Sequence, residues 1–542
     1  MRPDEGKLRS AALAVIVIAG SLVARRARAA DWYVDAAASG AHDGKSWSTA
    51  WSNVSDVGAV SPGDTIFISG GTASQTYSIA GGWNVKGGTD GMPIHYEVGQ
   101  DAAHDGIVVF DAGGTWNVLR PENHVEIDGD VGGARHMQFI HGNAATSSAM
   151  TTLMTEPNGG VVDQRFRYLE LNGGVVVSGA TGVEFDHVKW NATNWVNRAL
   201  FCQGSSALGT FTDCWLHDSE IWVVRDVGAS YTGDDGFAGY NALIENNVFG
   251  TVPIAANTYI GQAQQHQDLI QGSAGYLKIV GNWFQDSDQY CVYGEFAYDG
   301  GKLLLANNVM VNCAAASVAI GPTGSNRKIA DVIVANNLAV ESGQFGVGDP
   351  YPMPTAAFTD TYVYNNVTIN GGGFDFGTAP SDVTQSNNLD SAAGLAFVSY
   401  TEGQPTTADF HLTSGAVAAI DTGKDLSSLG SSIGAPDLDF ATDKDGVARP
   451  QGKGWDIGPY ELCDDGCAPA VDAGVDAGDA SGTSSTSDAG DAGDAGDAAR
   501  SATPSPTTPQ SGCSCDAAPR RSASAWVSLL AGLLLARRRR MR

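Results

Sequence analysis

Apolar residues recur at every second position in short segments of the second half of the chain. Leu277 and Ile279 form one such pair and Leu303 and Leu305 the next, as in β-strands with one face turned inward. Each segment runs into an asparagine, and the repeated asparagines are Asn247, Asn282, Asn308, Asn337, Asn366 and Asn388. The gaps between them are 35, 26, 29, 29 and 22 residues, a period typical of a solenoid of stacked coils.

Asparagine suits the corner of a coil because it tolerates the left-handed backbone of a sharp turn, and its amide can hydrogen-bond along the stack. Earlier segments at Val125, Tyr168, Val183 and Thr210 share the strand pattern in degenerate form. We therefore predict an all-β fold, a right-handed single-stranded parallel β-helix over residues 31–462, with about a dozen coils. The alternative is a β-propeller, but the sequence has no blade repeat of about 40 residues.

The N-terminus has the three parts of a secretory signal. Residues 1–30 begin with basic side chains, continue with an apolar run from Ala11 to Ala24 and end with small residues at Ala27 and Ala29. The apolar run is too short for an ordinary membrane span. We predict a cleaved signal peptide and an exported protein.

A low-complexity segment follows the predicted β-helix. Residues 463–511 are built on Asp-Ala-Gly repeats and then on Ser, Thr and Pro. They contain too little apolar surface to fold, and their like charges favour an extended chain. We predict an acidic stalk that holds the β-helix away from a surface.

The last segment, residues 512–542, contains Cys513 and Cys515, an apolar run from Trp526 to Ala536 and then four arginines. The order of these parts resembles the C-terminal sorting signal of myxobacterial surface proteins. The resemblance implies that the tail is removed and that the cysteine-bearing end is anchored at the outer membrane. A plain membrane anchor is the alternative, and it would also leave the body outside the cytoplasm.

The formal net charge of −29 argues against nucleic acid as a partner. An acidic body would also repel a polyanionic glycan unless cations bridge the two. The eight cysteines fall in neighbouring pairs, Cys202 with Cys214, Cys291 with Cys313, Cys463 with Cys467, and Cys513 with Cys515. Export permits disulfides, although the sequence leaves their connectivity open, and no Cys/His set has zinc spacing.

Two motifs bracket the predicted β-helix, WYVD at Trp32 with PGDTI at Pro62, and DKDG at Asp443 with DIGPYE at Asp456. The first resembles the opening coil of the pectate lyase-like superfamily, in particular its chondroitinase B and alginate lyase branch. The second resembles the closing motif of bacterial β-helix surface proteins. The resemblance implies the fold, but the lysine and arginine segments that carry catalysis in the lyase branch have no clear copy here. The catalytic residues of that family therefore cannot be transferred.

The densest group of polar side chains lies between residues 262 and 295. His266 and Asp268 are two positions apart, so on a strand they share a face, a geometry that can orient an imidazole or hold a cation. We predict catalytic residues His266, Lys278 and Arg225, substrate-binding residues Gln271, Tyr290 and Trp222, and metal ligands Asp268, Asp286, Asp288 and Glu295. Lys189 is a further candidate for the base or its charge support. Gathered carboxylates suit Ca²⁺. The alternatives are turn capping for the aspartates and a solvated strand position for the lysine.

These features predict an exported protein, anchored at the bacterial cell surface, that engages polysaccharide as a monomer. Cleavage of a uronate-containing glycan by β-elimination is the specific expectation, with Ca²⁺ neutralising the uronate carboxylate. A noncatalytic carbohydrate-binding or adhesive protein is the first alternative. A glycoside hydrolase, which needs two opposed carboxylates, is the second.

Overall fold

The computed structural model describes residues 29–115, 117–140, 152–156, 160–191, 198–204, 212–226, 235–254, 267–272, 275–296, 301–322, 328–329, 331–347, 357–377, 383–432 and 440–463. All of them belong to one compact unit, Met1–Ala473, and a second unit, Gly474–Arg542, lies outside the described residues. The predicted signal peptide (1–30), stalk (463–511) and sorting tail (512–542) therefore lie outside the described residues, except for positions 29, 30 and 463.

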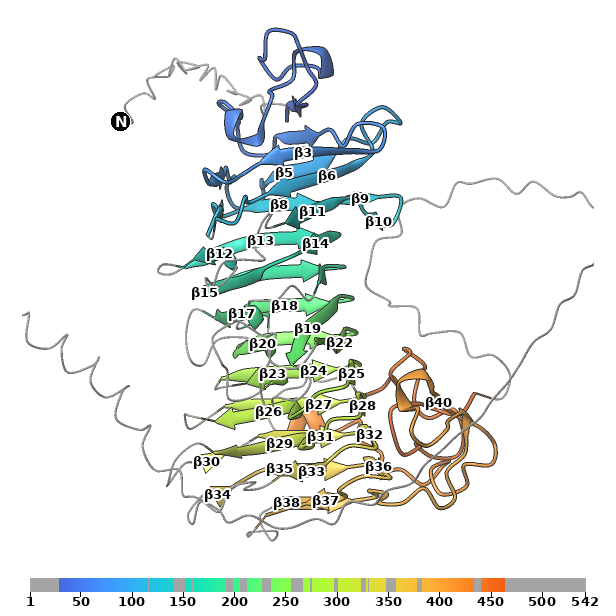
Figure 1. Cartoon of the computed structure of the whole chain (residues 1–542). Coiled ribbons are helices and arrows are strands. Elements are labelled where there is room, and N and C mark those ends of the chain that lie inside the picture. The colour runs from blue at the N-terminus through green and yellow to red at the C-terminus, as the bar shows by residue number, and fades with distance from the viewer. Residues whose placement is uncertain are drawn as a thin grey trace, which may run out of the picture. The chain divides into compact units, whose positions relative to one another are not determined.

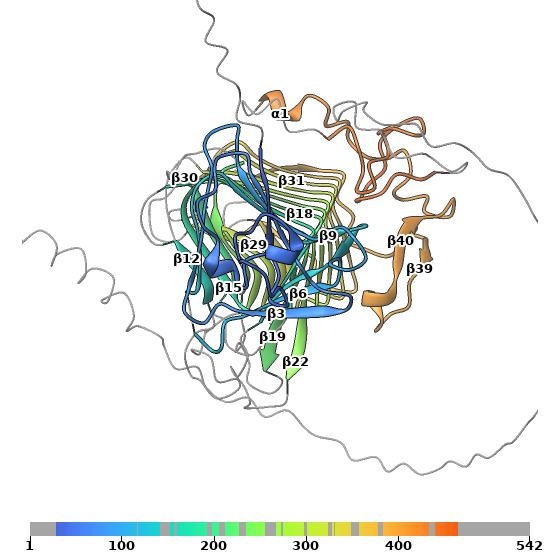
Figure 2. The same cartoon turned by 90° about the horizontal axis from the view of Figure 1, so that it is seen from above.

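The predicted fold is confirmed, because the chain is a right-handed parallel β-helix in which each coil contributes strands to three stacks (Figure 1). A 23-stranded parallel sheet contains the first and second stacks, and an 11-stranded sheet forms the third. The two stacks of the larger sheet are continuous because β15 (Gly174–Asp186) runs around the corner between them. Seen from above, strands surround the interior, and β39 (Phe397–Ser399) and β40 (Asp409–Leu412) lie outside it (Figure 2).

The strands of the stacks are short, as expected of a solenoid. The first stack contains β4 (Trp83–Val85), β7 (Leu119–Pro121), β12 (Thr152–Glu156), β17 (Arg198–Gly204), β20 (Asp235–Tyr240), β23 (Asp268–Gly272), β26 (Tyr290–Phe296), β29 (Ala316–Pro322), β33 (Gln344–Val347) and β37 (Phe374–Asp375). The second contains β1 (Asp31–Val34), β2 (Thr65–Ile68), β5 (Ile94–Val98), β8 (Val125–Asp128), β13 (Val161–Arg167), β18 (Cys214–His217), β21 (Ala242–Glu245), β24 (Tyr276–Val280), β27 (Lys302–Ala306), β31 (Val332–Ala335), β35 (Thr361–Tyr364) and β38 (Val383–Ser386).

The third stack contains β3 (Ser74–Ser78), β6 (Ile107–Asp111), β11 (Met137–Ile140), β14 (Leu169–Leu171), β16 (Lys189–Trp190), β19 (Glu220–Asp226), β22 (Val248–Ile254), β25 (Trp283–Gln285), β28 (Val309–Val311), β32 (Leu338–Val340) and β36 (Val367–Ile369). Outside the stacks lie β9 (Asp130–Val131), β10 (Ala134–Arg135), β30 (Lys328–Ile329), β34 (Ala357–Phe358), α1 (Leu429–Ser432) and three single 3₁₀ turns, Trp47–Thr49, Val54–Asp56 and Pro405–Thr407. No helix among the described residues has the length and hydropathy needed to cross a membrane.

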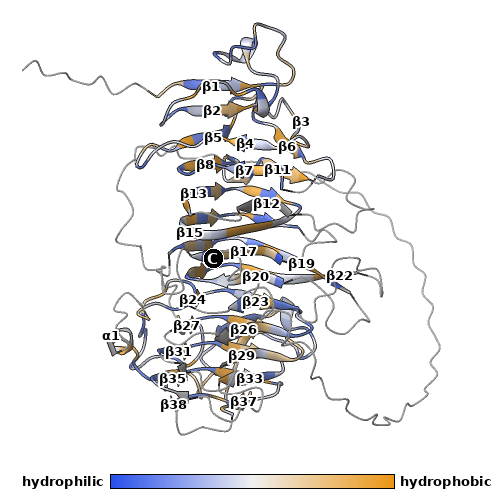
Figure 3. Ribbon diagram, turned by 90° about the vertical axis from the view of Figure 1, so that its left-hand side faces the viewer, coloured by the Kyte–Doolittle hydropathy of each residue, from blue (hydrophilic) through white to orange (hydrophobic). Residues whose placement is uncertain are grey.

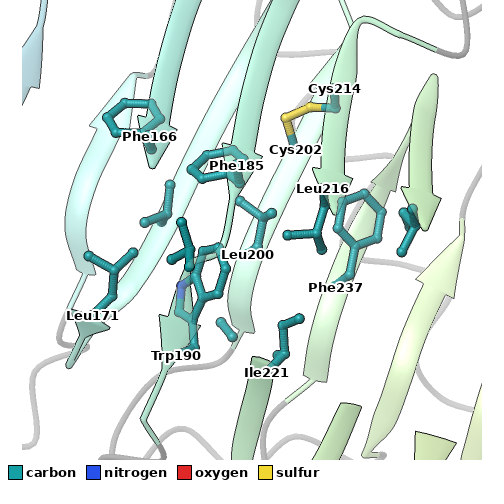
Figure 4. Close-up of a cluster of buried hydrophobic side chains, with 14 of the residues drawn as sticks. Phe166, Leu171, Phe185, Trp190, Leu200, Cys202, Cys214, Leu216, Ile221 and Phe237 are labelled. Atoms are coloured by element: carbon teal, nitrogen blue, oxygen red, sulfur yellow. A yellow bond between two sulfur atoms is a disulfide. The ribbon is translucent and has the colours of Figure 1, made fainter. Parts of the chain in front are cut away.

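The interior is filled by the apolar side chains of alternate strand positions. The strands contain both hydrophobic and hydrophilic residues (Figure 3). Phe166, Phe185 and Trp190 pack together beside the disulfide Cys202–Cys214 (Figure 4). A second disulfide, Cys291–Cys313, joins neighbouring coils. Both predicted pairs whose two cysteines are described, Cys202 with Cys214 and Cys291 with Cys313, are therefore disulfides, and Cys463 is disulfide-bonded as well.

The asparagine pairs mark the corner between the second and third stacks, and the two members of a pair have different roles. The first member adopts the left-handed conformation, for example Asn307 at φ 56° and Asn336 at φ 55°. The second is buried and forms the ladder, with Asn308 Nδ2 donating to Asn337 Oδ1 at 2.9 Å. The expectation that one corner asparagine does both is thus corrected, because a side chain in the left-handed position points away from the stack of amides.

The last described segments, residues 391–432 and 440–462, form a clasp on the outside of the final coils. Its apolar residues pack on outward side chains of the second and third stacks, and they include Phe410, Leu426, Phe440, Trp455, Ile457 and Tyr460. First-position asparagines bind its backbone, since Asn365 Nδ2 donates to the carbonyl of Lys424 at 2.9 Å. A fully buried ion pair, Arg449 Nη1 to Glu461 Oε1 at 2.6 Å, holds the clasp together.

Candidate active site

Charged side chains cover the outward face of the second stack in the first half of the β-helix. Register places them in two columns, His95, Glu126, Arg165 and Glu184 in one, and Glu97, Asp128, Arg167, Asp186, His217 and Glu245 in the other. The Nη1 atom of Arg167 lies 3.2 Å from Asp128 Oδ2, and its Nε lies 3.1 Å from Asp186 Oδ2. We call these columns the charge ladder. Its acids and bases pair along the helix axis.

The corner beside the charge ladder departs from the asparagine rule. Tyr168, His187 and Asp218 hold the left-handed position there, at φ 51°, 53° and 49°, where the later coils use asparagine or glycine. A bulky residue in this region is strained by about 1–2 kcal/mol. Such strain persists where the surrounding structure requires that side chain at that place, and it points to function.

A pocket of about 340 Å³ opens at this corner. Its lining residues come from three stretches of sequence and are Gly133, Ala134, Arg135, Tyr168, Glu170, His187 and Lys189. The two-stranded β9–β10 hairpin contributes Arg135, and the corner contributes Tyr168 and His187. Glu170 comes from β14 and Lys189 from β16. A pocket that gathers a phenol, an imidazole, two cations and a carboxylate is a candidate site for acid–base chemistry.

The imidazole of His187 is held from two sides. Its Nδ1 is hydrogen-bonded to Asp186 Oδ1, and its ring stacks on Tyr168 with centroids 4.5 Å apart and planes 14° apart. Since Nδ1 is bound, Nε2 is the nitrogen that a substrate would meet. The side chain is 41% exposed. A carboxylate that orients a partly exposed imidazole in this way is the arrangement of a general base.

Proton affinities in this region depend on both burial and charge. Burial raises the pKa of Tyr168, so its hydroxyl keeps its proton at neutral pH. Burial disfavours the charged form of Asp186, but the hydrogen bond with His187 and the charge of His217 outweigh it and lower its pKa. Burial also opposes protonation of His217, yet hydrogen bonds to Asp218 and Glu184 raise its pKa to about 9.

Two cations flank the pocket and share one carboxylate. Arg135 Nη1 lies 2.8 Å from Glu220 Oε1, and Lys189 Nζ lies 3.5 Å from Glu220 Oε2. Arg135 Nε also donates to the carbonyl of His187 at 2.5 Å. The guanidinium is therefore tied to the backbone of the histidine beside it, and both cations are held at the same edge of the pocket.

The structure brings three of the sequence-predicted residues together, but as a structural contact. Arg225 Nη1 lies 3.0 Å from Asp288 Oδ1 and 3.3 Å from the carbonyl of Asp286. Asp286 adopts the left-handed conformation at φ 62°, and its carboxylate accepts a hydrogen bond from Asn312 at 2.6 Å. This cluster closes the turn between the third and first stacks, as the turn-capping alternative requires.

The other predicted residues are distributed over different faces. Lys278 is on the outward face of the second stack, where it pairs in register with Leu243 and Leu304. Asp268 is buried at the start of β23 in the first stack, so the structure does not bring it to the lysine. Gln271 lies on β23, and Tyr290 begins β26 and stacks on Tyr293 at 5.0 Å.

Two predicted residues cannot be placed, and one lies near the pocket. His266 is outside the described residues, as is the side chain of Glu295, whose backbone belongs to β26. Trp222 is on β19, and its Nε1 donates to Glu220 Oε2 at 3.2 Å. It thereby contacts Glu220, the carboxylate that binds both cations of the pocket.

Two of the four predicted Ca²⁺ ligands, Asp286 and Asp288, are engaged in other contacts. Ca²⁺ takes six to eight oxygen ligands, whereas Asp288 already faces the guanidinium of Arg225 and the Asp286 carboxylate is bound by Asn312. Among the described residues, clustered possible metal ligands are Glu184, Asp186, His187, His217 and Asp218. Those side chains already pair with one another or with Arg167, and the positive charges of Arg167 and His217 oppose a bound cation.

Apart from Lys189, the charged and aromatic residues of the pocket were missed by the sequence reasoning, although a signal was present. The segments at Tyr168 and Val183 were assigned as degenerate coils because they lack the asparagine pair. Their corner positions contain tyrosine and histidine instead, which is the local rule-breaking expected at a functional site. Arg135 and Glu220 had no such signal, because their contact spans 85 residues of sequence.

Comparison with known proteins yields similar folds and no relative in sequence. No family model and no curated protein matches the chain. Pectate lyase Pel9A matches with a TM-score of 0.44 and 15% identity over 80% of this chain and 96% of that one. The PL6 family alginate lyase AlyGC gives 0.39 and 12% over 66% of this chain and 56% of that one. A GH136 lacto-N-biosidase from Eubacterium ramulus gives 0.41 and 10%, covering 68% of both chains.

These similarities assign neither a family nor an activity to the chain. The class of protein is defined by its own strand pairing, which is that of a parallel β-helix, and the fold alone does not determine the chemistry.

Proposed function

We propose that this protein is an exported cell-surface β-helix that binds an acidic polysaccharide in the pocket of Tyr168 and His187 and cleaves it by β-elimination at a uronate. The observation that supports the proposal most directly is the pairing of an aspartate-held imidazole with a protonated phenol, next to two cations. This combination supplies each function that the reaction needs.

In the proposed reaction, His187 Nε2 takes the proton from C5 of the uronate. The electrons of that bond form the C4–C5 double bond, and the bond from C4 to the glycosidic oxygen breaks. The Tyr168 hydroxyl gives its proton to the departing oxygen. Positive charge near the uronate carboxylate stabilises the carbanion character at C5, and the cations at the edge of the pocket supply it.

Export and anchoring are part of the proposal and rest on the sequence. The signal-like residues 1–30, the acidic repeats of 463–511 and the Cys, apolar and Arg order of 512–542 favour a protein displayed on a stalk at the bacterial surface. We propose that it acts there as a monomer on extracellular glycan. Fractionation of the producing cell, with protease shaving of intact cells, tests the location.

The test of catalysis measures the ultraviolet absorbance of new unsaturated uronate ends over a panel of polyuronates. His187→Asn keeps a residue that tolerates the left-handed corner, so we expect it to fold and to lose turnover by about 100-fold or more. Tyr168→Phe keeps the ring and should also lose turnover. The matched control is His124→Asn, because His124 is also left-handed, at φ 59°, and bound to an aspartate, but lies outside the pocket.

Each other result has a definite meaning. Glycan binding without turnover on any polyuronate would replace the proposal by the noncatalytic, adhesive alternative. Turnover that survives His187→Asn but is lost in Lys278→Met would favour the sequence-predicted site on the later coils.

A further inference from the structure

We infer that Arg135 and Lys189 together bind the uronate carboxylate of the substrate, and that no divalent cation takes part in the site. This inference deepens the proposed function and rests on it. It follows from the hydrogen bonds that the two cations and the two nearby carboxylates already make.

The first step concerns the hydrogen-bond donors of Arg135. Its Nε donates to the carbonyl of His187 at 2.5 Å, and its Nη1 faces Glu220 Oε1 at 2.8 Å. Nη2 is thus the nitrogen that remains for a ligand in the pocket. Because the guanidinium is tied to the histidine's own backbone, a carboxylate bound there is placed next to the base.

The second step concerns Lys189, which begins β16 and lines the same pocket. Its Nζ lies 3.5 Å from Glu220 Oε2, so one carboxylate orients both cations. Glu220 is itself fixed by a hydrogen bond from Trp222 at 3.2 Å. Burial by itself would raise the pKa of Glu220, but the hydrogen bonds from Trp222 and Arg135 outweigh burial and lower the pKa below its usual value. The carboxylate therefore stays ionised and keeps both cations in place.

The third step is that the carboxylates of the site are already committed. Glu170 accepts hydrogen bonds from Asn191 at one oxygen and from Gln138 at the other, the latter at 2.8 Å. Glu220 faces Arg135, Lys189 and Trp222. A Ca²⁺ ion would need to displace these donors and to lie beside two positive charges, which is unfavourable for a cation that requires six or more oxygens.

The substrate class follows from this charge pattern. A paired guanidinium and ammonium bind a carboxylate, whereas the neutral methyl ester or the carboxyl-reduced sugar offers no negative charge to them. The site therefore selects free uronate over its esterified or reduced forms. Because the overall charge is −29, a local cationic pair favours the approach of a polyanion to this site.

The experiment measures the binding of a uronate trisaccharide to the full-length His187→Asn protein by calorimetry, once in EDTA and once with added Ca²⁺. We expect equal affinity in both buffers and a loss of about tenfold or more when Arg135→Gln or Lys189→Met is added. The carboxyl-reduced trisaccharide should bind to the His187→Asn protein about as weakly as the uronate trisaccharide binds to the variants that also lack Arg135 or Lys189. Arg165→Gln is the matched control, because Arg165 is an exposed arginine beside Asp163 and Glu184 outside the pocket.

The outcomes separate this inference from the proposed function. Wild-type turnover that EDTA abolishes and Ca²⁺ restores would overturn the inference and leave β-elimination standing. Tight, EDTA-resistant binding that depends on Arg135, with no turnover in the wild type, would support the inference and overturn β-elimination. Binding that neither Arg135→Gln nor Lys189→Met weakens would overturn the inference whatever the turnover.

Discussion

At the scale of single residues, the left-handed position at the corner between the second and third stacks is held by residues that tolerate it in some coils and by a strained residue in another. Asn246, Asn307, Asn336 and Asn365 adopt the left-handed conformation at φ 55–57°, which asparagine tolerates. Tyr168 pays a conformational penalty at the same kind of position. This strained side chain lines the pocket, and strain that persists at such a place points to function.

His217 predicts how stability changes with pH. Its pKa is raised from 6.5 to about 9 in the folded protein, so its contribution is fully present below about pH 6.5 and is lost as the pH rises through 9. We expect His217→Gln to lower stability at pH 6 by up to about 3 kcal/mol and to flatten the decline toward pH 9. Urea unfolding at a series of pH values measures this.

The control for that measurement is His411, whose pKa is also raised to about 9, first by its hydrogen bond to Asp445. Its side chain is 45% exposed, so solvent screening should make the effect of His411→Gln smaller. A decline with pH that is the same in wild type and His217→Gln would show that His217 does not stabilise the fold as a charged imidazole.

At the scale of elements, the buried asparagine ladder joins the coils through side chains as well as backbone. Asn337 Oδ1 accepts from both the backbone N–H and the side-chain amide of Asn308, and its own amide donates to Leu305 and Asn366. Each amide thus satisfies groups of the coils on both sides, which is why the residue recurs once per coil.

Asn337→Ala should therefore be strongly destabilising. It removes these bonds and leaves buried donors and acceptors of neighbouring coils unsatisfied, at about 3 kcal/mol or more in the free energy of unfolding. Asn246→Gly is the control, because Asn246 is exposed and left-handed, and glycine occupies the equivalent corner at Gly281. We expect that variant to unfold within about 1 kcal/mol of the wild type in denaturant titration. Similar losses for both would mean that the corner, not the ladder, stabilises the coils.

At the scale of the described unit, the clasp covers apolar side chains that point outward from the last coils. Leu304, Ile333 and Tyr364 face Leu426, Phe440 and Trp455 in one cluster. Without the clasp, the second stack would present an apolar sheet face to water, which favours aggregation. The outward face of this stack thus changes from a charge ladder in the early coils to a covered apolar surface in the late ones.

Glu461→Gln tests the clasp in the intact chain. It leaves Arg449 buried without its partner charge, and we expect a loss of about 3–5 kcal/mol. The clasp should unfold before the coils, so binding of a hydrophobic dye rises while the β-sheet circular dichroism signal remains. The control is Glu122→Gln in the exposed pair with Lys86, which should change stability by about 1 kcal/mol or less. Coincident loss of both signals would show that clasp and coils unfold as one unit.

Much of the fold could be predicted from the sequence, because its signals are local. A strand period of two, a corner asparagine and a spacing of 22 to 35 residues each depend on neighbours within one coil. The pairs Cys202–Cys214 and Cys291–Cys313 lie within one or two coils and were visible as neighbours. The parallel stacking follows from repetition of such units.

The site depends on contacts that no local pattern encodes. Coils differ in length, so only the stacking of the coils, together with the placement of the β9–β10 hairpin and of the turns between strands, determines that Arg135 meets Glu220, 85 residues away, and that Arg225 meets Asp288, 63 residues away. The sequence by itself determined the solenoid and its corner residues. Only the tertiary structure decided which charges pair and which surround the pocket, because stacking converts distant sequence positions into neighbours one strand apart.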